Sequence, residues 1–147
     1  MNTPQVISLV TGILGAILGS AALAVSISTD LRDRPQLKVL LQWDMAELNT
    51  GRKMGLVRVT NIGRRPAHVG IVALVLPEKY EHSHLTLNQS IQGERLEEGD
   101  RPEGFIVNYD GLAQYKAGWN KIRAMAEDST GKVYYSDFPK KKPSWAA

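Results

Sequence analysis

The segment VISLVTGILGAILGSAALAVSI, residues 6–27, decides how the rest of this 147-residue chain is interpreted. It is apolar throughout, and no charged side chain precedes Asp30. As a helix it would reach roughly 33 Å, which matches the ~30 Å hydrocarbon layer of a bilayer. Thr3 can cap its start, and Pro35 disfavours helical geometry at Arg34. We therefore expect a transmembrane helix from about Pro4 to about Asp33, with residues 1–35 forming the helix and its link.

Small side chains recur inside this segment at spacings of three and four residues, which places them on one face of the helix. In lipid, a face of small residues allows two helix backbones to approach closely and pack. We expect this face to contact another integral membrane protein, although Gly, Ala and Ser are also common in membrane helices generally. The residues are Ser8, Gly12, Gly15, Gly19, Ala22 and Ser26.

The flanking charges predict an orientation. No Lys or Arg precedes the apolar segment, whereas Arg32, Arg34 and Lys38 follow it closely. Basic residues favour the cytoplasmic side, so we expect a single span of the inner (cell) membrane, with the N-terminus outside and the remainder cytoplasmic. A periplasmic domain is the alternative. The sequence Ala22-Leu23-Ala24 resembles a signal-peptidase site, but the missing basic residues before the segment argue against a cleaved signal.

The charges after the helix are unevenly distributed. Residues 36–139 hold 13 basic and 13 acidic side chains, and the net charge of +3 comes from the final residues 140–147. A neutral domain excludes the basic face used by nucleic-acid-binding proteins. The absence of cysteine excludes disulfides and thiolate metal sites. We expect a basic tail that contacts the membrane surface or, equally, stays disordered; the predicted contact residues are Arg32, Arg34, Lys140, Lys141, Lys142 and Trp145.

Residues 36–139 predict a β-domain. Alternating apolar residues, buried apolar runs and turn residues indicate seven short strands, the last two paired through the turn Asp128-Ser129-Thr130-Gly131. Seven strands in about a hundred residues favour an all-β, immunoglobulin-like sandwich. Gly93–Gly104 should be a charged loop with Leu96 in the core, and residues 110–118 a short helical turn. The predicted strands are residues 36–44, 54–61, 68–76, 85–91, 105–109, 119–128 and 132–138.

Three short motifs carry a resemblance. They are RDRPQLKV at residues 32–39, N-x-G-x-R-P at Asn61–Pro66, and DSTG before an aromatic strand at Asp128–Tyr135. In the second motif, Gly63 is free to take a positive φ. With the preceding helix, the three motifs make the chain similar to small bacterial single-span membrane proteins that carry a C-terminal immunoglobulin-like domain. The resemblance implies a fold and an anchor. It implies no activity, and no functional residue is carried over from it.

Residues suited to chemistry are few. His82 and His84, beside Glu81, would share one side of a strand, but a metal site needs a third ligand. The carboxylates Glu94, Glu97, Glu98 and Asp100 lie in the charged segment and are expected to be solvated. The glycosylation sequence Asn88-Gln89-Ser90 matters only in a secreted eukaryotic domain. No nucleophile elbow or phosphate-binding loop is present.

These features favour a non-enzymatic accessory subunit of a larger membrane complex of respiratory, photosynthetic or transport type. Its predicted partners are integral membrane subunits and lipid, with no nucleic acid, small-molecule substrate, cofactor or metal. The first alternative is a free-standing anchored module that binds a soluble partner. The second is a metal-dependent enzyme that uses His82 and His84.

Overall fold

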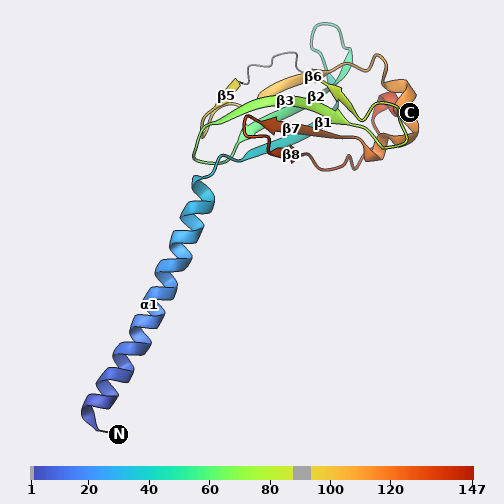
Figure 1. Cartoon of the computed structure of the whole chain (residues 1–147). Helices are drawn as coiled ribbons and strands as arrows, with labels where there is room; N and C mark the ends of the chain where they lie inside the picture. The colour runs from blue at the N-terminus through green and yellow to red at the C-terminus, as the bar shows by residue number, and fades with distance from the viewer. Residues whose placement is uncertain (1, 88–93) are drawn as a thin grey trace. The chain divides into compact units, whose positions relative to one another are not determined.

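A computed structural model describes residues 2–87 and 94–147, without the side chain of Arg32 (Figure 1). The predicted strand residues Gln89 and Ile91 and the sequence Asn88-Gln89-Ser90 lie outside the described residues. The chain forms two compact units, Met1–Arg34 and Pro35–Ala147. The second unit includes the last eight residues, the predicted basic tail.

The first unit is the helix α1, Thr3–Asp33. Asn2, rather than Thr3, is the N-cap residue, and its backbone N–H donates to Gln5 Oε1 at 3.2 Å. Arg34 leaves the helix with φ −77° and ψ 146°, as expected for a residue before proline. The helix is long and apolar enough over Thr3–Leu31 to span a membrane, a property that a signal sequence near the N-terminus shares.

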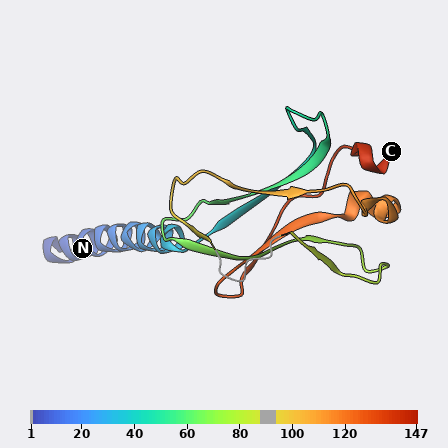
Figure 2. The ribbon, with the colours of Figure 1, turned by 90° about the horizontal axis from the view of Figure 1, so that it is seen from above.

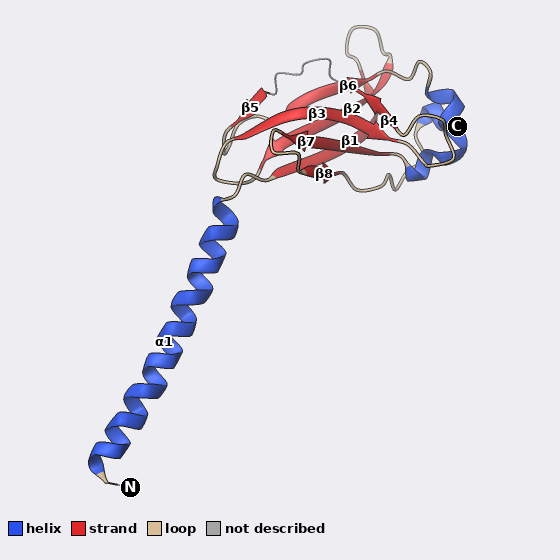
Figure 3. Cartoon of the chain, in the orientation of Figure 1, coloured by secondary structure: helices blue, strands red, loops and turns tan. Residues whose placement is uncertain are grey.

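The second unit contains eight antiparallel strands within the described residues, one more than predicted, arranged in two sheets (Figures 2 and 3). One sheet has the order β1-β2-β6, and the other has the order β4-β3-β7-β8 with β5 also paired to β3. The strands are β1 Leu37–Ala46, β2 Lys53–Asn61, β3 Ala67–Val75, β4 His84–Thr86, β5 Glu94–Leu96, β6 Glu103–Val107, β7 Arg123–Asp128 and β8 Val133–Tyr135. The two 3-10 helices are η1, Leu112–Lys121, and η2, Ser144–Ala146.

A single apolar core lies between the two sheets. On β1, Leu37 and Val39 are buried while Lys38 and Leu40 are exposed, which confirms the predicted alternation. On β3, the consecutive residues Val72, Ala73 and Leu74 are all buried, as expected for a central strand. The largest fully buried side chains come from both sheets and the segments that join them: Val57, Val59, Val69, Val72, Leu74, Ile122 and Pro143.

The structure differs from the predicted strands at several places. Residues 119–121 belong to η1 and not to a strand, and β7 begins only at Arg123. Gly118 interrupts η1 with a φ of −117° and a ψ of 16°, and it packs closely, because a Cβ there would lie 2.9 Å from Pro77 Cγ. β5 lies inside the predicted charged loop, although Leu96 is buried as expected. The predicted pairing of the last two strands is confirmed by β7 and β8.

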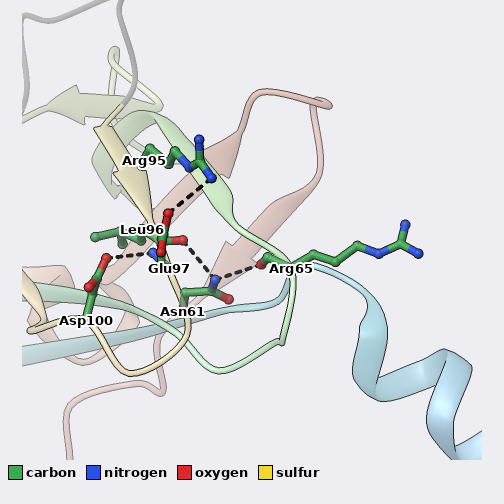
Figure 4. A network of polar contacts seen from close by, with 6 residues as sticks. All are labelled: Asn61, Arg65, Arg95, Leu96, Glu97 and Asp100. Atoms are coloured by element: carbon green, nitrogen blue, oxygen red, sulfur yellow. Dashed lines mark hydrogen bonds and ion pairs between the residues drawn. The ribbon is translucent and has the colours of Figure 1, made fainter.

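The N-x-G-x-R-P motif forms a polar network that joins β2 to β5 (Figure 4). Asn61 is buried, and its Nδ2 donates to the carbonyl oxygens of Arg65 at 2.8 Å and Leu96 at 2.9 Å. Its Oδ1 accepts the N–H of Gly63 at 3.0 Å. The side chain thus replaces backbone pairing at a turn between the sheets. Gly63 is not among the glycines with positive φ.

Candidate functional site

The first candidate surface is the small-residue face of α1. At Gly12, Gly15 and Gly19 nothing lies within 4 Å of the position that a Cβ would occupy. Ser8, Ala22 and Ser26 on the same face are exposed as well. Nothing within α1 itself fills the space above these glycines, so a second helix backbone could approach along this face.

The hydroxyl groups of α1 divide into two classes. Those of Thr11, Ser20, Ser28 and Thr29 donate to helix carbonyl oxygens three or four residues earlier, at 2.8–2.9 Å. Such bonds leave no free donor on these parts of the helix surface. The hydroxyls of Ser8 and Ser26 form no hydrogen bond with any described residue, and both lie on the small-residue face. They can donate across a helix interface.

The second candidate surface is a groove of about 590 Å³ between β1 and the segment that follows β8. We call it the β1 groove. Phe138 forms part of its wall, and the guanidinium of Arg123 lies 5.0 Å from the centre of the Phe138 ring. Its other apolar residues are Leu40, Leu41, Trp43 and Pro139, and its charged residues are Asp44, Asp137, Lys140, Lys141 and Lys142.

The C-terminal segment is tied to one end of this groove by Asp44. The Asp44 carboxylate accepts the backbone N–H of Ser144 at 3.0 Å and also the Ser144 hydroxyl. The hydroxyl of Tyr109 donates to the same carboxylate at 3.2 Å. Burial alone would raise the pKa of Asp44, but the hydrogen bonds from Ser144 and Tyr109 outweigh it and lower the pKa. Asp44 also has a φ of 59°, a conformation that non-glycine residues adopt rarely.

The predicted membrane-contact residues have different surroundings in the structure. The Trp145 ring packs edge-on against Trp43 with centroids 5.5 Å apart, and its Nε1 is buried. The rest of Trp145 is partly exposed, so its predicted contact with the membrane surface stays a prediction. Lys140, Lys141 and Lys142 are exposed and form no ion pair within the described residues. Arg34 pairs with Asp30 at 2.9 Å, and the side chain of Arg32 lies outside the described part.

The two histidines lie apart from any larger group of ligands. His84 Nδ1 and the hydroxyl of Ser83 are 2.8 Å apart, and His82 and His84 are both exposed. No group of three or more His, Asp or Glu side chains within the described residues could hold a metal ion. The described chain therefore offers no third ligand to this pair.

A carboxyl pair connects the strands β5 and β6, which belong to different sheets. Burial, a hydrogen bond with Glu94 and the charge of Glu94 together raise the pKa of Glu103 to about 7, with burial the largest cause. The sequence interpretation placed Glu94 in a solvated loop, because the charged residues around Leu96 hid the short strand β5. The pairing of Val69 with Glu94 in the sheet is what brings this carboxyl group to Glu103.

The sequence matches no protein-family model, and no curated protein matches it either. The interpretation of these surfaces therefore depends on their chemistry alone.

Proposed function

We propose that this protein is a non-enzymatic, single-pass accessory subunit of a larger membrane complex of respiratory, photosynthetic or transport type. The observation that carries the proposal is the open small-residue face of α1. Its three glycines have free space above them, and the free hydroxyls of Ser8 and Ser26 lie along the same line. Close packing and interhelical hydrogen bonds are the forces that associate helices in lipid.

In this proposal, the β-domain is an immunoglobulin-like fold that braces neighbouring subunits. Two antiparallel sheets around one core support that interpretation of the architecture. The domain would lie in the cytoplasm, because Arg34 and Lys38 follow the helix and no basic residue precedes it.

The packing face is tested by Gly15→Leu combined with Gly19→Leu. We expect the double variant to lose its partners when it is extracted from native membranes, as measured by native mass and co-purification. The control is Ala21→Leu with Ala24→Leu, which places the same two side chains about 170° around the helix. A complex that survives the glycine substitutions as well as the alanine substitutions contradicts the proposal.

The orientation is tested by labelling. The chain has no cysteine, and Leu48 at the tip of the β1–β2 hairpin is 99% exposed, so Leu48→Cys provides a unique thiol. A maleimide that cannot cross membranes should label it only after the cells are permeabilised. Labelling of intact cells would place the β-domain outside.

A free-standing anchored module is the second candidate function, and the β1 groove is the observation that favours it. Native mass of the detergent-extracted protein separates the two. An accessory subunit migrates with other polypeptides, whereas a free-standing module migrates as the single chain in its micelle.

A further inference from the structure

The β1 groove follows the free edge of a strand. β1 is the outer strand of its sheet within the described residues, since it pairs there only with β2. Side chains of consecutive strand residues point to opposite faces, yet both Leu40 and Leu41 line the groove. A groove that contacts both must run along the edge of the strand and not over one face of the sheet.

The main chain of β1 has unused hydrogen-bonding groups at this edge. The carbonyl oxygen of Gln36 accepts the N–H of Ile62 at 2.8 Å, so every second residue from Gln36 bonds to β2. Val39 faces away from β2 but is only 4% exposed, whereas the N–H and C=O groups of the partly exposed Leu41 point away from β2 beside the groove. No described residue forms a hydrogen bond with them on that side. Exposed groups of this kind pair readily with another extended chain.

The rim of the groove has an excess of positive charge. Lys140, Lys141 and Lys142 line it without an ion pair in the described chain, whereas one of its two carboxylates, Asp44, is engaged by Ser144 and Tyr109. Leu40 and Phe138 are 40% and 50% exposed, so the apolar wall is also uncovered. The occupant must therefore combine an extended backbone, some apolar side chains and negative charge.

We propose that the β1 groove binds an extended, acidic peptide segment of a partner protein, which adds to the edge of β1 as a further strand. The free backbone groups of β1 distinguish this occupant from an anionic lipid, because an acyl chain has no donor or acceptor to satisfy them. The inference concerns the β-domain alone. It names what the groove recognises and holds whether or not α1 packs in a complex.

The test uses the full-length chain in an uncharged detergent and arrays of labelled peptides of about eight residues, a usual strand length. In one array Glu alternates with Val, Ile, Leu, Phe or Thr, and in a matched array Lys replaces Glu. We expect binders only among the Glu peptides. In a further test, alternate backbone nitrogens of the best-binding peptide are N-methylated, which removes hydrogen-bond donors without changing the charge. We expect this to weaken the affinity of that peptide about tenfold.

The variant K140Q/K141Q/K142Q should bind the best Glu peptide about tenfold more weakly, as expected for the loss of up to three surface ion pairs. The control K79Q/K121Q/K132Q removes the same charge at exposed positions outside β1 and should bind normally. Leu40→Glu, at an exposed position, provides a second variant that should abolish binding. Near-UV circular dichroism checks that each variant is folded.

Three results would overturn the inference. The first is an absence of binders in the Glu array, or equal binding to the Lys array. The second is unchanged binding of the N-methylated peptide, because attraction of charge alone would then explain the affinity. The third is displacement of the peptide by soluble short-chain phosphatidylglycerol that itself binds in a manner dependent on Lys140–Lys142, which would assign the groove to lipid.

Discussion

The helix α1 and the β-domain both contain many apolar residues, but these side chains are exposed in α1 and form a buried core in the β-domain. In α1, Leu14, Ile17 and Leu18 are 54%, 59% and 69% exposed. In the β-domain, Leu74 and Ile122 are completely buried. The β-domain covers its own apolar surface, whereas α1 leaves its surface for another medium or another molecule. The same residue type therefore has a different energetic role in each unit, and paired substitutions can measure the difference.

The largest effect is expected from truncating leucine. Leu74→Ala should lower the free energy of unfolding of the β-domain by about 2–5 kcal/mol, because it leaves a cavity in a packed core. Leu14→Ala, the same change on α1, should alter that free energy by less than about 0.5 kcal/mol. Guanidinium unfolding of the full-length protein in detergent, followed by near-UV circular dichroism, measures both. Equal losses would show that the two units do not differ in this way.

Glycine substitutions give the next largest difference. A Cβ on Gly55 would lie 2.7 Å from Cζ3 of Trp43 and 3.0 Å from Cβ of Val107. Gly55→Ala should therefore cost about 1–3 kcal/mol through overpacking. Gly15→Ala meets nothing within 4 Å and should not destabilise the β-domain. The same unfolding assay tests the pair, and a neutral Gly55→Ala would contradict the close contact with Trp43.

A third test concerns the buried carboxylate of Asp128 in the β7–β8 turn. Burial tends to raise its pKa, but hydrogen bonds from Thr130, Lys132 and Tyr134 outweigh this and lower it. The stabilisation is present above the unfolded pKa of about 4 and is lost as the pH falls through the lower folded pKa. Asp128→Asn should cost about 1–2 kcal/mol at neutral pH. It should also flatten the loss of stability in acid, as measured by unfolding at a series of pH values.

Glu103 should show the opposite sign. Its folded pKa of about 7 lies above the unfolded value, so the folded state retains a proton that the unfolded chain has lost. Stability should then decrease as the pH rises from about 4.5 to about 7 and level off above that. Glu103→Gln should remove this slope and stabilise the protein at alkaline pH by less than about 1 kcal/mol, since the side chain is partly exposed to solvent. A stability curve without this slope in the natural protein would contradict the raised pKa.

The smallest effect is expected at the C-terminal segment. Ser144→Ala removes one of the donors to Asp44 and should change the global free energy of unfolding by less than about 1 kcal/mol. Its local effect should be clear, because residues 140–147 should exchange amide hydrogens faster while Ile122 and Leu74 remain protected. Hydrogen exchange with mass spectrometry reports both regions at once. Unchanged exchange in the segment would show that Asp44 does not hold it.

The sequence predicted α1 and the order of most strands, because their signals are local. The apolar length of residues 6–27 and the alternation from Leu37 to Trp43 each follow from neighbours in the chain. Leu96 was also assigned correctly to the core. The short strand β5 was missed, since Glu94 and Arg95 pair with β3 through contacts that the local charge pattern does not reveal.

The β1 groove could not be predicted, although several of its residues were identified. Lys140–Lys142 and Trp145 were interpreted as a tail because their composition is typical of disordered ends. Their actual position depends on Asp44, a hundred residues earlier, and on a β-bulge between Gln42 and Met45 that places that carboxylate. Gly55 could have indicated close packing near Trp43, because a glycine within a strand often marks the close approach of another group.

The hydroxyl of Tyr134 has a consequence for the order in which the chain is completed during synthesis. It donates to the carbonyl oxygen of Pro35 at 3.3 Å, across 99 residues. At translation rates of about 5–20 residues per second, the ribosome needs roughly 5–20 s to make the intervening chain. Throughout that interval the β-domain cannot form this contact, because Tyr134 has not yet been made. A nascent chain of this protein therefore exposes unfinished sheet edges for seconds, and binding by a chaperone would matter most in that period.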